Sequence, residues 1–173
     1  NDYPRAVWSG HENLWPLMQF WLSRHDGFRQ MGAALDQALN RFREGEIDAR
    51  QFGRFFGPRL QQFLGELEGH HQIEDHHYFP VFMAAERRLV AGFELLEGDH
   101  DLIHHRIGLV VDSANALFRQ LQTGDRDKIR RLADAYAETS DVLVSGLMRH
   151  LDDEEDLIVP LVLDRTEAAL GVG

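Results

Sequence analysis

The feature that most constrains this chain is the helical spacing of its apolar residues, which continues through nearly all of its 173 residues. Apolar side chains recur in steps of three and four, which is the pattern of amphipathic helices. No run of useful length alternates between apolar and polar side chains, as a half-buried strand would. Prolines number only five. These observations predict an all-α protein.

Four long helical segments are predicted, at residues 12–43, 49–79, 92–122 and 126–163. Turn signals at Gly45–Asp48 and Thr123–Asp125 separate the first segment from the second and the third from the fourth. Short turns between long helices make sequence neighbours antiparallel. The sequence therefore predicts an antiparallel, up-down four-helix bundle in a single domain of residues 1–173. An N-terminal extension of about residues 1–11 precedes the bundle at about 12–163, and a short tail follows it.

Caps and prolines set the expected limits of these helices. Ser9 stands three residues before a glutamate, which is the spacing of a capping box, and Pro16 fits only a first turn. Asp48 is a good N-cap for the second helix. Within that helix, Pro58 predicts a break or kink and Pro80 an end or bend. Residues 81–91 remain ambiguous between helix and loop.

Composition excludes several classes of function. The net charge of −11 argues against nucleic acid as a partner, because binding to its backbone needs a basic footprint. The absence of cysteine excludes disulfides, thiolate metal ligands and a cysteine nucleophile. No apolar stretch is long enough to span a membrane, and the N-terminus lacks the pattern of a signal peptide. We therefore expect a cytoplasmic protein, monomeric or homodimeric, since Trp8 and Trp15 near one end can expose apolar surface.

The apolar stripe of each predicted helix turns polar at one level. Burying carboxylates in an apolar core without partners is costly. Two carboxylates and several imidazoles that converge are what a buried metal cluster requires. The polar residues on the four stripes are His25 in the first segment, His70, Glu74 and His77 in the second, His100 and His104 in the third, and His150 and Glu154 in the fourth.

The spacing of these residues supports a metal site. Three pairs are four residues apart, which places both members on one helix face: His70 with Glu74, His100 with His104, and His150 with Glu154. The second and fourth segments also share a pattern, because HHQIEDHHYFP and HLDDEEDLIVP both read His-x-x-x-Glu-x-x-x-x-x-Pro. Two such helices can supply matching halves of a two-metal site.

The neighbouring titratable residues have the wrong phase or an ambiguous one. His71, His76 and His105 lie one residue off their stripes, about 100° round the helix, and we expect them to support the ligands or to face solvent. Asp75 and Glu155 are placed in the same way. His77 lies on the stripe one turn beyond Glu74, and it can be an extra ligand, a hydrogen-bond partner of a ligand, or a proton donor.

The arrangement resembles the hemerythrin-like (HHE cation-binding) domain family from His25 to Pro160. HHQIEDHHYFP is similar to the family's His-His-x-x-Glu-Glu stretch that ends in Phe-Pro. EGDHDLIHHR resembles the signature of the third helix, and RHLDDEEDLIVP that of the fourth. In that family a four-helix bundle holds a pair of irons that share an oxo or hydroxo bridge.

The resemblance implies a ligand for each position of such a site. It assigns His100, His104 and His150 to one iron, His25 and His70 to the other, and Glu74 and Glu154 as bridges. Oxygen-carrying hemerythrins have an aspartate five residues after the histidine of the fourth helix. Here Glu154 is four residues after His150 and Glu155 is five residues after it. Whether Glu154 or Glu155 forms the bridge stays open.

Three functions fit such a centre. The favoured one is binding of dioxygen or another small diatomic ligand for sensing, delivery or storage, in a pocket lined by Trp21, Phe28, Leu67, Ile103 and Leu147. The second is a diiron redox enzyme, such as a peroxidase, an oxidase or a nitric oxide-handling protein, with His77 or Tyr78 as proton source. The third is iron handling or a structural metal. Nitrogen and oxygen ligands without sulfur suit iron but do not exclude zinc, manganese or nickel.

Overall fold

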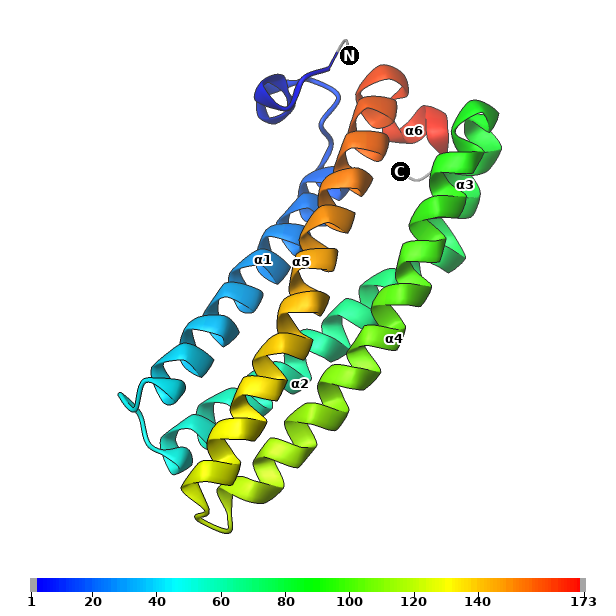
Figure 1. The fold of residues 1–173 in the computed structure, drawn as a ribbon. Coiled ribbons are helices and arrows are strands. Elements are labelled where there is room, and N and C mark those ends of the chain that lie inside the picture. The colour runs from blue at the N-terminus through cyan, green and yellow to red at the C-terminus, as the bar shows by residue number, and fades with distance from the viewer. Residues whose placement is uncertain (1–2, 172–173) are drawn as a thin grey trace.

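The computed structural model describes residues 3–171 as a succession of helices (Figure 1). The long helices are α1 (Pro16–Arg43), α2 (Ala49–Ile73), α4 (Val90–Leu121) and α5 (Arg126–Arg165). The shorter elements are η1 (Arg5–Gly10), η2 (Glu74–Tyr78), α3 (Phe79–Ala85), η3 (Arg87–Leu89) and α6 (Glu167–Leu170). Residues 1–2 and 172–173, at the ends of the predicted extension and tail, lie outside the described residues.

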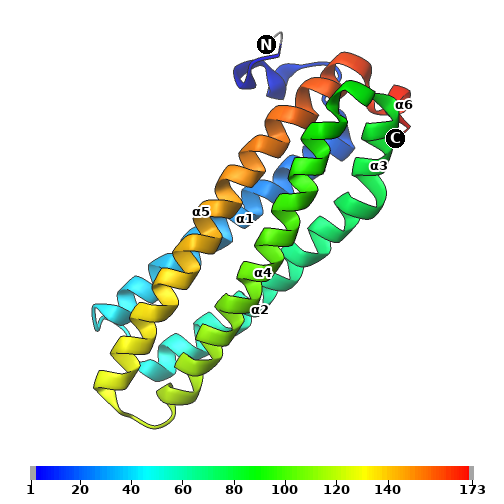
Figure 2. The same cartoon turned by 45° about the vertical axis from the view of Figure 1, so that its right-hand side comes forward.

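The four long helices form the predicted antiparallel bundle. Helix α1 contacts α2 and α5, and α4 contacts the same two helices, so that the four close a ring. The α1–α2 and α4–α5 turns lie at one end of the bundle, and η1, α3 and α6 lie at the other (Figures 1 and 2). The prediction of an all-α four-helix bundle is confirmed.

The two turns and the caps follow from local sequence. Gly45 and Gly124 have φ angles of 78° and 77°, a backbone conformation that glycine adopts without steric cost. The side chain of Asp48 accepts a hydrogen bond from the backbone N–H of Gln51, which completes a capping box at the start of α2. The side chain of Asp125 caps α5 in a similar way. The prediction that Asp48 is an N-cap is confirmed.

The helices differ from the predicted ones at three places. Helix α1 begins at Pro16 rather than at residue 12, and Ser9 lies within η1 instead of capping α1. A proline in the first helical turn loses no hydrogen bond, because those N–H groups lack partners in any helix. Pro58 lies inside α2, so of the break or kink predicted there the break does not occur. Pro160 lies inside α5, which runs to Arg165 rather than to residue 163.

Of the end or bend predicted at Pro80, the end does not occur, because a π-helical turn carries the helix past it. The N–H of Phe79 donates to the carbonyl of Glu74, five residues earlier, and the helix then continues to Ala85. Because of this wider turn, the next side chain after Glu74 that faces the core is Phe79. His77 is therefore exposed rather than on the buried stripe. Single π turns of this kind are frequent at functional sites.

The core consists of two apolar clusters on either side of a polar layer. One cluster includes Phe28 and Leu67 and fills the end with the two turns. The other includes Trp21 and Phe79 and fills the end with the termini. Residue His25 lies on α1 between Trp21 and Phe28, and is fully buried. Burying such aromatic side chains stabilises the fold by about 1.5–3 kcal/mol each, which supports the nearby burial of polar groups.

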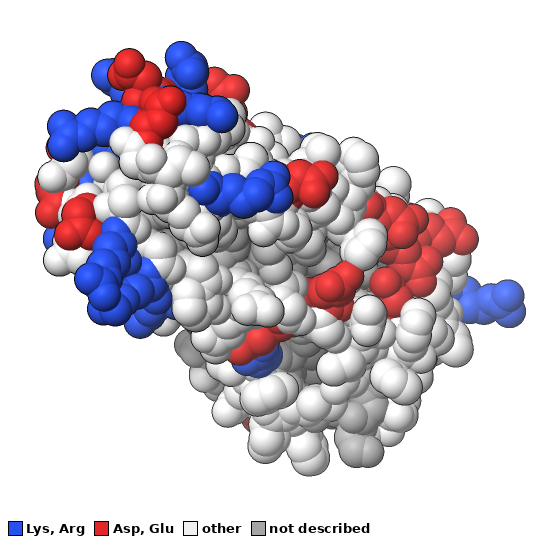
Figure 3. Space-filling model, turned by 90° about the horizontal axis from the view of Figure 1, so that it is seen from below, with Lys and Arg blue, Asp and Glu red and all other residues white. Residues whose placement is uncertain are grey.

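The charged side chains, whose net charge is −11, are distributed unevenly over the surface. Figure 3 shows charged side chains of both signs at one side of the face that it views and a group of acidic side chains at the other. Within the described part of the chain, no helix combines the length and the apolarity that crossing a membrane demands.

Candidate metal centre

The polar layer brings together five imidazoles and two carboxylates from all four sides of the bundle. Each of these side chains is buried. They are His25 on α1, His70 and His71 on α2, Glu74 at the start of η2, His100 on α4, and His150 and Glu154 on α5. Six of the seven predicted ligands are therefore brought together, and one histidine that was not predicted joins them.

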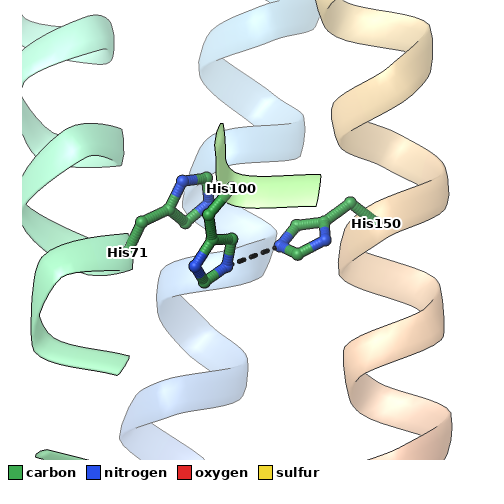
Figure 4. Close-up of side chains that lie close together, drawn as sticks. All are labelled: His71, His100 and His150. Atoms are coloured by element: carbon green, nitrogen blue, oxygen red, sulfur yellow. Dashed lines mark hydrogen bonds between the residues drawn. The ribbon is translucent and has the colours of Figure 1, made fainter. Parts of the chain in front are cut away.

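Three histidines form the first group of possible ligands. The rings of His71, His100 and His150 point toward one another from α2, α4 and α5 (Figure 4). One nitrogen from each lies within 4.8 Å of the others. The Nε2 atoms of His100 and His150 are 3.0 Å apart, and the His71 ring stacks on that of His100 at a centroid distance of 3.9 Å.

Two histidines and both carboxylates form the second group. The Nε2 atoms of His25 and His70 are 3.0 Å apart. One ligand atom from each of His25, His70, Glu74 and Glu154 lies within 4.8 Å of the others. Helix α1 thus contributes through His25, and the pair His70 and Glu74 contributes from one face of α2 and η2.

Each carboxylate faces both groups. Glu154 Oε1 is 3.1 Å from His150 Nε2 and 3.2 Å from His100 Nε2, whereas its Oε2 is 3.5 Å from His25 Nε2. Glu74 Oε1 is 3.1 Å from His70 Nε2, and its Oε2 is 3.6 Å from His100 Nε2. Each side chain therefore offers one oxygen to each group, which is the arrangement that two bridging carboxylates need.

Unpartnered buried atoms show that the residues fit a metal. His71 Nε2, Glu74 Oε2 and Glu154 Oε2 are buried without a hydrogen-bond partner. Leaving such an atom unsatisfied costs about 1–3 kcal/mol. Cations bound between the two groups would satisfy all three atoms, and the donors are the nitrogen and oxygen types that iron, manganese and zinc accept.

The structure does not bring His104, the seventh predicted ligand, to this cluster. Its side chain is 70% exposed, and its Nδ1 lies 3.0 Å from Glu68 Oε1 on the outside of the bundle. The stripe of α4 steps from His100 to Ile103 and Ile107, both buried, rather than through His104. His104 lies about 80° from the centre of that stripe, so it cannot face the core while Ile103 does.

His71 takes the place that the sequence gave to His104. Of the two roles predicted for it, facing solvent is excluded, because its ring is buried inside the first group. The sequence carried a usable signal: His71 is four residues after Leu67 and three before Glu74, so it belongs to a stripe that uses both steps. Helix α2 packs against both α1 and α4, so its buried face is wider than the one row of residues that passes through His70.

Carboxylates outside the centre hold the far nitrogens of two histidines. His100 Nδ1 is 2.6 Å from Asp75 Oδ1, and His25 Nδ1 is 3.0 Å from Glu155 Oε1. Such bonds fix the tautomer and the orientation of the ring and leave Nε2 free to bind a metal. His150 Nδ1 is 3.6 Å from Asp99 Oδ2, which is too far for a hydrogen bond.

Burial controls the protonation of the metal-free centre. It raises the pKa of Glu74 and of Glu154 well above the usual range, and the neighbouring carboxylates reinforce this effect. Burial also lowers the pKa of His70 to about 2 and that of His100 to about 3. Burial thus favours protonated carboxyls and neutral imidazoles in the metal-free form.

Metal binding at neutral pH is expected to release about two protons per chain. The raised pKa of Glu74 and of Glu154 favours the protonated carboxyl, which a bound cation would ionise, whereas neutral histidines have no proton to lose. Titrating metal-free protein with Mn²⁺ in a weakly buffered indicator solution measures the release. Glu154→Gln should lower the number by about one. Binding without proton release in the unaltered protein would show that both carboxyls were already ionised.

A small apolar cavity lies beside Glu74. Its volume is about 20 Å³, which is room for roughly one water-sized molecule. The indole N–H of Trp21 donates to Glu74 Oε1 at 2.6 Å at this point. The residues that line the cavity are Leu17, Met18, Trp21, Glu74, Tyr78, Phe79, Phe82 and Ile158.

Only one of the residues predicted to line a ligand pocket lies at this cavity, namely Trp21. Phe28, Leu67 and Leu147 pack in the apolar cluster on the other side of the polar layer. Ile103 lines a separate polar pocket beside His150. The residues predicted to line the pocket lie on both sides of the polar layer, whereas the cavity lies only on the side that faces the chain termini.

Comparison with known proteins agrees with this geometry. No curated protein and no solved structure is significantly similar to the chain. The model of a family described as the hemerythrin HHE cation binding domain matches residues 17–162. The match spans all seven residues of the centre and nearly the whole chain. The chain therefore belongs to the hemerythrin HHE cation-binding domain family.

Proposed function

We propose that this protein binds two iron ions in the polar layer and binds dioxygen reversibly there. The observation that carries the proposal is the position of Glu74 and Glu154, each with one oxygen near a member of the three-histidine group and the other near a member of the two-histidine group. Two separate metal positions joined by two carboxylates require this arrangement. A single ion would leave one of the two histidine groups without a partner.

The unequal numbers of histidines support ligand binding at one of the two positions. Two bridging carboxylates and an oxo or hydroxo bridge would give each metal three ligands. His71, His100 and His150 would complete six-coordination at one position. His25 and His70 would leave the other position with one place open. A ferrous pair at such a centre supplies the electrons that dioxygen binding needs.

The cavity supports the same position as the place of ligand entry. Glu74 Oε1, which Trp21 contacts, is the oxygen that faces His70 and hence the two-histidine group. Apart from Glu74, the cavity is lined by apolar and aromatic side chains, which exclude water. Its volume suits a diatomic molecule and is small for an organic substrate.

The test is the iron content per chain together with the visible spectrum, recorded after anaerobic reduction, after exposure to air and after removal of oxygen. About two irons and an absorption band that appears in air and disappears on deoxygenation are expected. Metal-free protein that takes up neither iron nor other divalent metals after reconstitution would refute the metal centre itself.

The runner-up is a diiron redox enzyme, and the observation in its favour is Tyr78. This side chain lines the cavity beside Glu74, where it can supply a proton or an electron, whereas His77 is exposed. Two irons with a band that does not reverse, and with steady consumption of oxygen or peroxide in the presence of a reductant, would favour this function. Two irons with a fixed ferric spectrum and no turnover would favour iron handling.

A further inference from the structure

Glu155 lies directly behind His25 and is held from two sides by arginines. Its Oε1 is 3.0 Å from His25 Nδ1 and accepts a hydrogen bond from Arg29 Nη1 at 2.8 Å. Its Oε2 accepts a hydrogen bond from Arg5 Nη1, also at 2.8 Å. Glu155 is only 4% exposed. The carboxylate is therefore fixed in position by three groups on two other elements, η1 and α1.

Arg5 comes from the N-terminal element η1, which precedes the region that the family model matches. Its Nε donates to Asp156 Oδ1 and its Nη2 to the carbonyl oxygen of Asp152, each at 2.9 Å. The guanidinium also lies 5.1 Å from the ring centroid of the buried Trp8. Arg5 thus fastens the N-terminal segment across one turn of α5, at the level of the metal centre.

The other histidine partners are held differently. Asp75 contacts His100 and Asp99 lies near His150, but within the described part of the chain neither aspartate forms an ion pair with an arginine. Arg29 also binds Asp152, so both arginines and α5 form one network behind His25. The two-histidine position is therefore the one whose supporting carboxylate is locked by charge.

The hydrogen bond behind a histidine ligand matters because it sets the direction of the ring and hence of Nε2. The planar guanidinium of arginine binds several oxygens in fixed directions, which a lysine cannot reproduce. Loss of Arg5 would leave Glu155 Oε2 without its partner and open this side of the layer to solvent. The Glu155 side chain could then turn, and His25 with it.

We propose that Arg5 acts through Glu155 to position His25, so that docking of the N-terminal segment controls how readily metal leaves the two-histidine position. This inference rests on the metal centre proposed above. It makes Arg5 a positioning residue outside the part of the chain that the family model matches. The Arg5 side chain is 43% exposed. If its ion pairs were ordinary surface pairs, which contribute little, loss of Arg5 would leave metal binding unchanged.

The test uses full-length protein loaded with Co²⁺, a paramagnetic ion that shifts the N–H resonances of coordinated histidines. Two measurements are made: exchange of those resonances with solvent, and release of cobalt to a chelator. Arg5→Ala is compared with Arg5→Lys and with the matched control Arg43→Ala. Arg43 likewise joins the α1 side of the bundle to α5, through Asp134 at 2.8 Å, but about 30 Å away along α5.

In Arg5→Ala, one N–H resonance should shift and exchange faster, and cobalt should leave one of its positions about tenfold faster. Glu155→Gln should shift the same resonance, which identifies it as that of His25. Arg5→Lys should lie between Arg5→Ala and the unaltered protein in both measurements, because lysine restores the positive charge but not the planar set of N–H donors of arginine. Arg43→Ala should match the unaltered protein in both measurements.

Two outcomes would overturn the inference, and they are distinguishable. If Arg5→Ala binds cobalt with the resonances and the release rate of the unaltered protein, the N-terminal segment has no part in the centre, while the metal site stands. If the unaltered protein takes up no cobalt, iron or zinc, the metal centre fails and the inference fails with it. Thermal unfolding of the metal-free variants shows whether any effect follows general destabilisation instead.

Discussion

His71→Ala is expected to remove about one of two metal equivalents, whereas His104→Ala keeps both. His71 Nε2 is buried without a partner inside the three-histidine group, and His104 is exposed and paired with Glu68. Loss of a ligand should weaken binding by more than the roughly 10–100-fold that loss of a supporting group costs. Metal analysis after dialysis against a weak chelator measures the difference.

His105→Ala is the matched control, since His105 is a neighbouring exposed histidine on the same helix. It should bind metal like the unaltered protein. Loss of metal in His104→Ala, with full retention in His71→Ala, would contradict the assignment. It would mean that metal loading turns α4 enough to exchange the two histidines, and the His-x-x-x-His pair of the third helix would be restored as ligands.

Glu154→Leu is expected to abolish metal-dependent stabilisation and, at the same time, to stabilise the metal-free protein. Glu154 is fully buried and its Oε2 has no partner, so an apolar side chain of similar size removes an uncompensated polar group. A gain of about 1 kcal/mol would raise the melting temperature of the metal-free form by about 2–4 °C. The rise that added metal gives to the unaltered protein should disappear.

Glu155→Gln is the control that decides which acid forms the bridge. Glu155 lies behind His25 and points away from the space between the two groups, so this variant should still bind about two metals. Retention of both metals in Glu154→Leu, with their loss in Glu155→Gln, would assign the bridge to Glu155. Destabilisation of metal-free Glu154→Leu would instead show that the carboxyl has a structural role of its own.

Replacing Glu154 is expected to stabilise the metal-free protein and to abolish stabilisation by metal. These opposite effects follow from where the centre lies in the core. The polar layer interrupts the apolar core between Trp21 and Phe28 on α1, and without metal its buried atoms stay unsatisfied. The packing of the two clusters holds these side chains in place before any ion binds. A centre formed in advance in this way binds metal at the expense of stability in the metal-free state.

The composition of the centre could be read largely from local sequence. Six members each interrupt an apolar stripe, and helical spacing alone places them on the buried face: His25, His70, Glu74, His100, His150 and Glu154. The helices, their order and the caps at Asp48 and Asp125 are equally local, because they depend on residues within one or two turns. This is why the bundle and six of the seven members of the layer could be predicted.

The remaining assignments depend on contacts between helices and on one irregular turn. The choice between His71 and His104 follows from how far α2 and α4 are rotated against their neighbours, and i, i+4 spacing permits either. His77 does not lie on the buried stripe because the π turn at Glu74 holds one more residue than an α-helical turn and so rotates the following side chains. Glu155 meets Arg5 and Arg29 only because η1 and α1 pack beside α5. Sequence by itself thus determined which helices carry the ligand types, and the tertiary structure decided which side chains meet, because rotation and packing are set by the whole core.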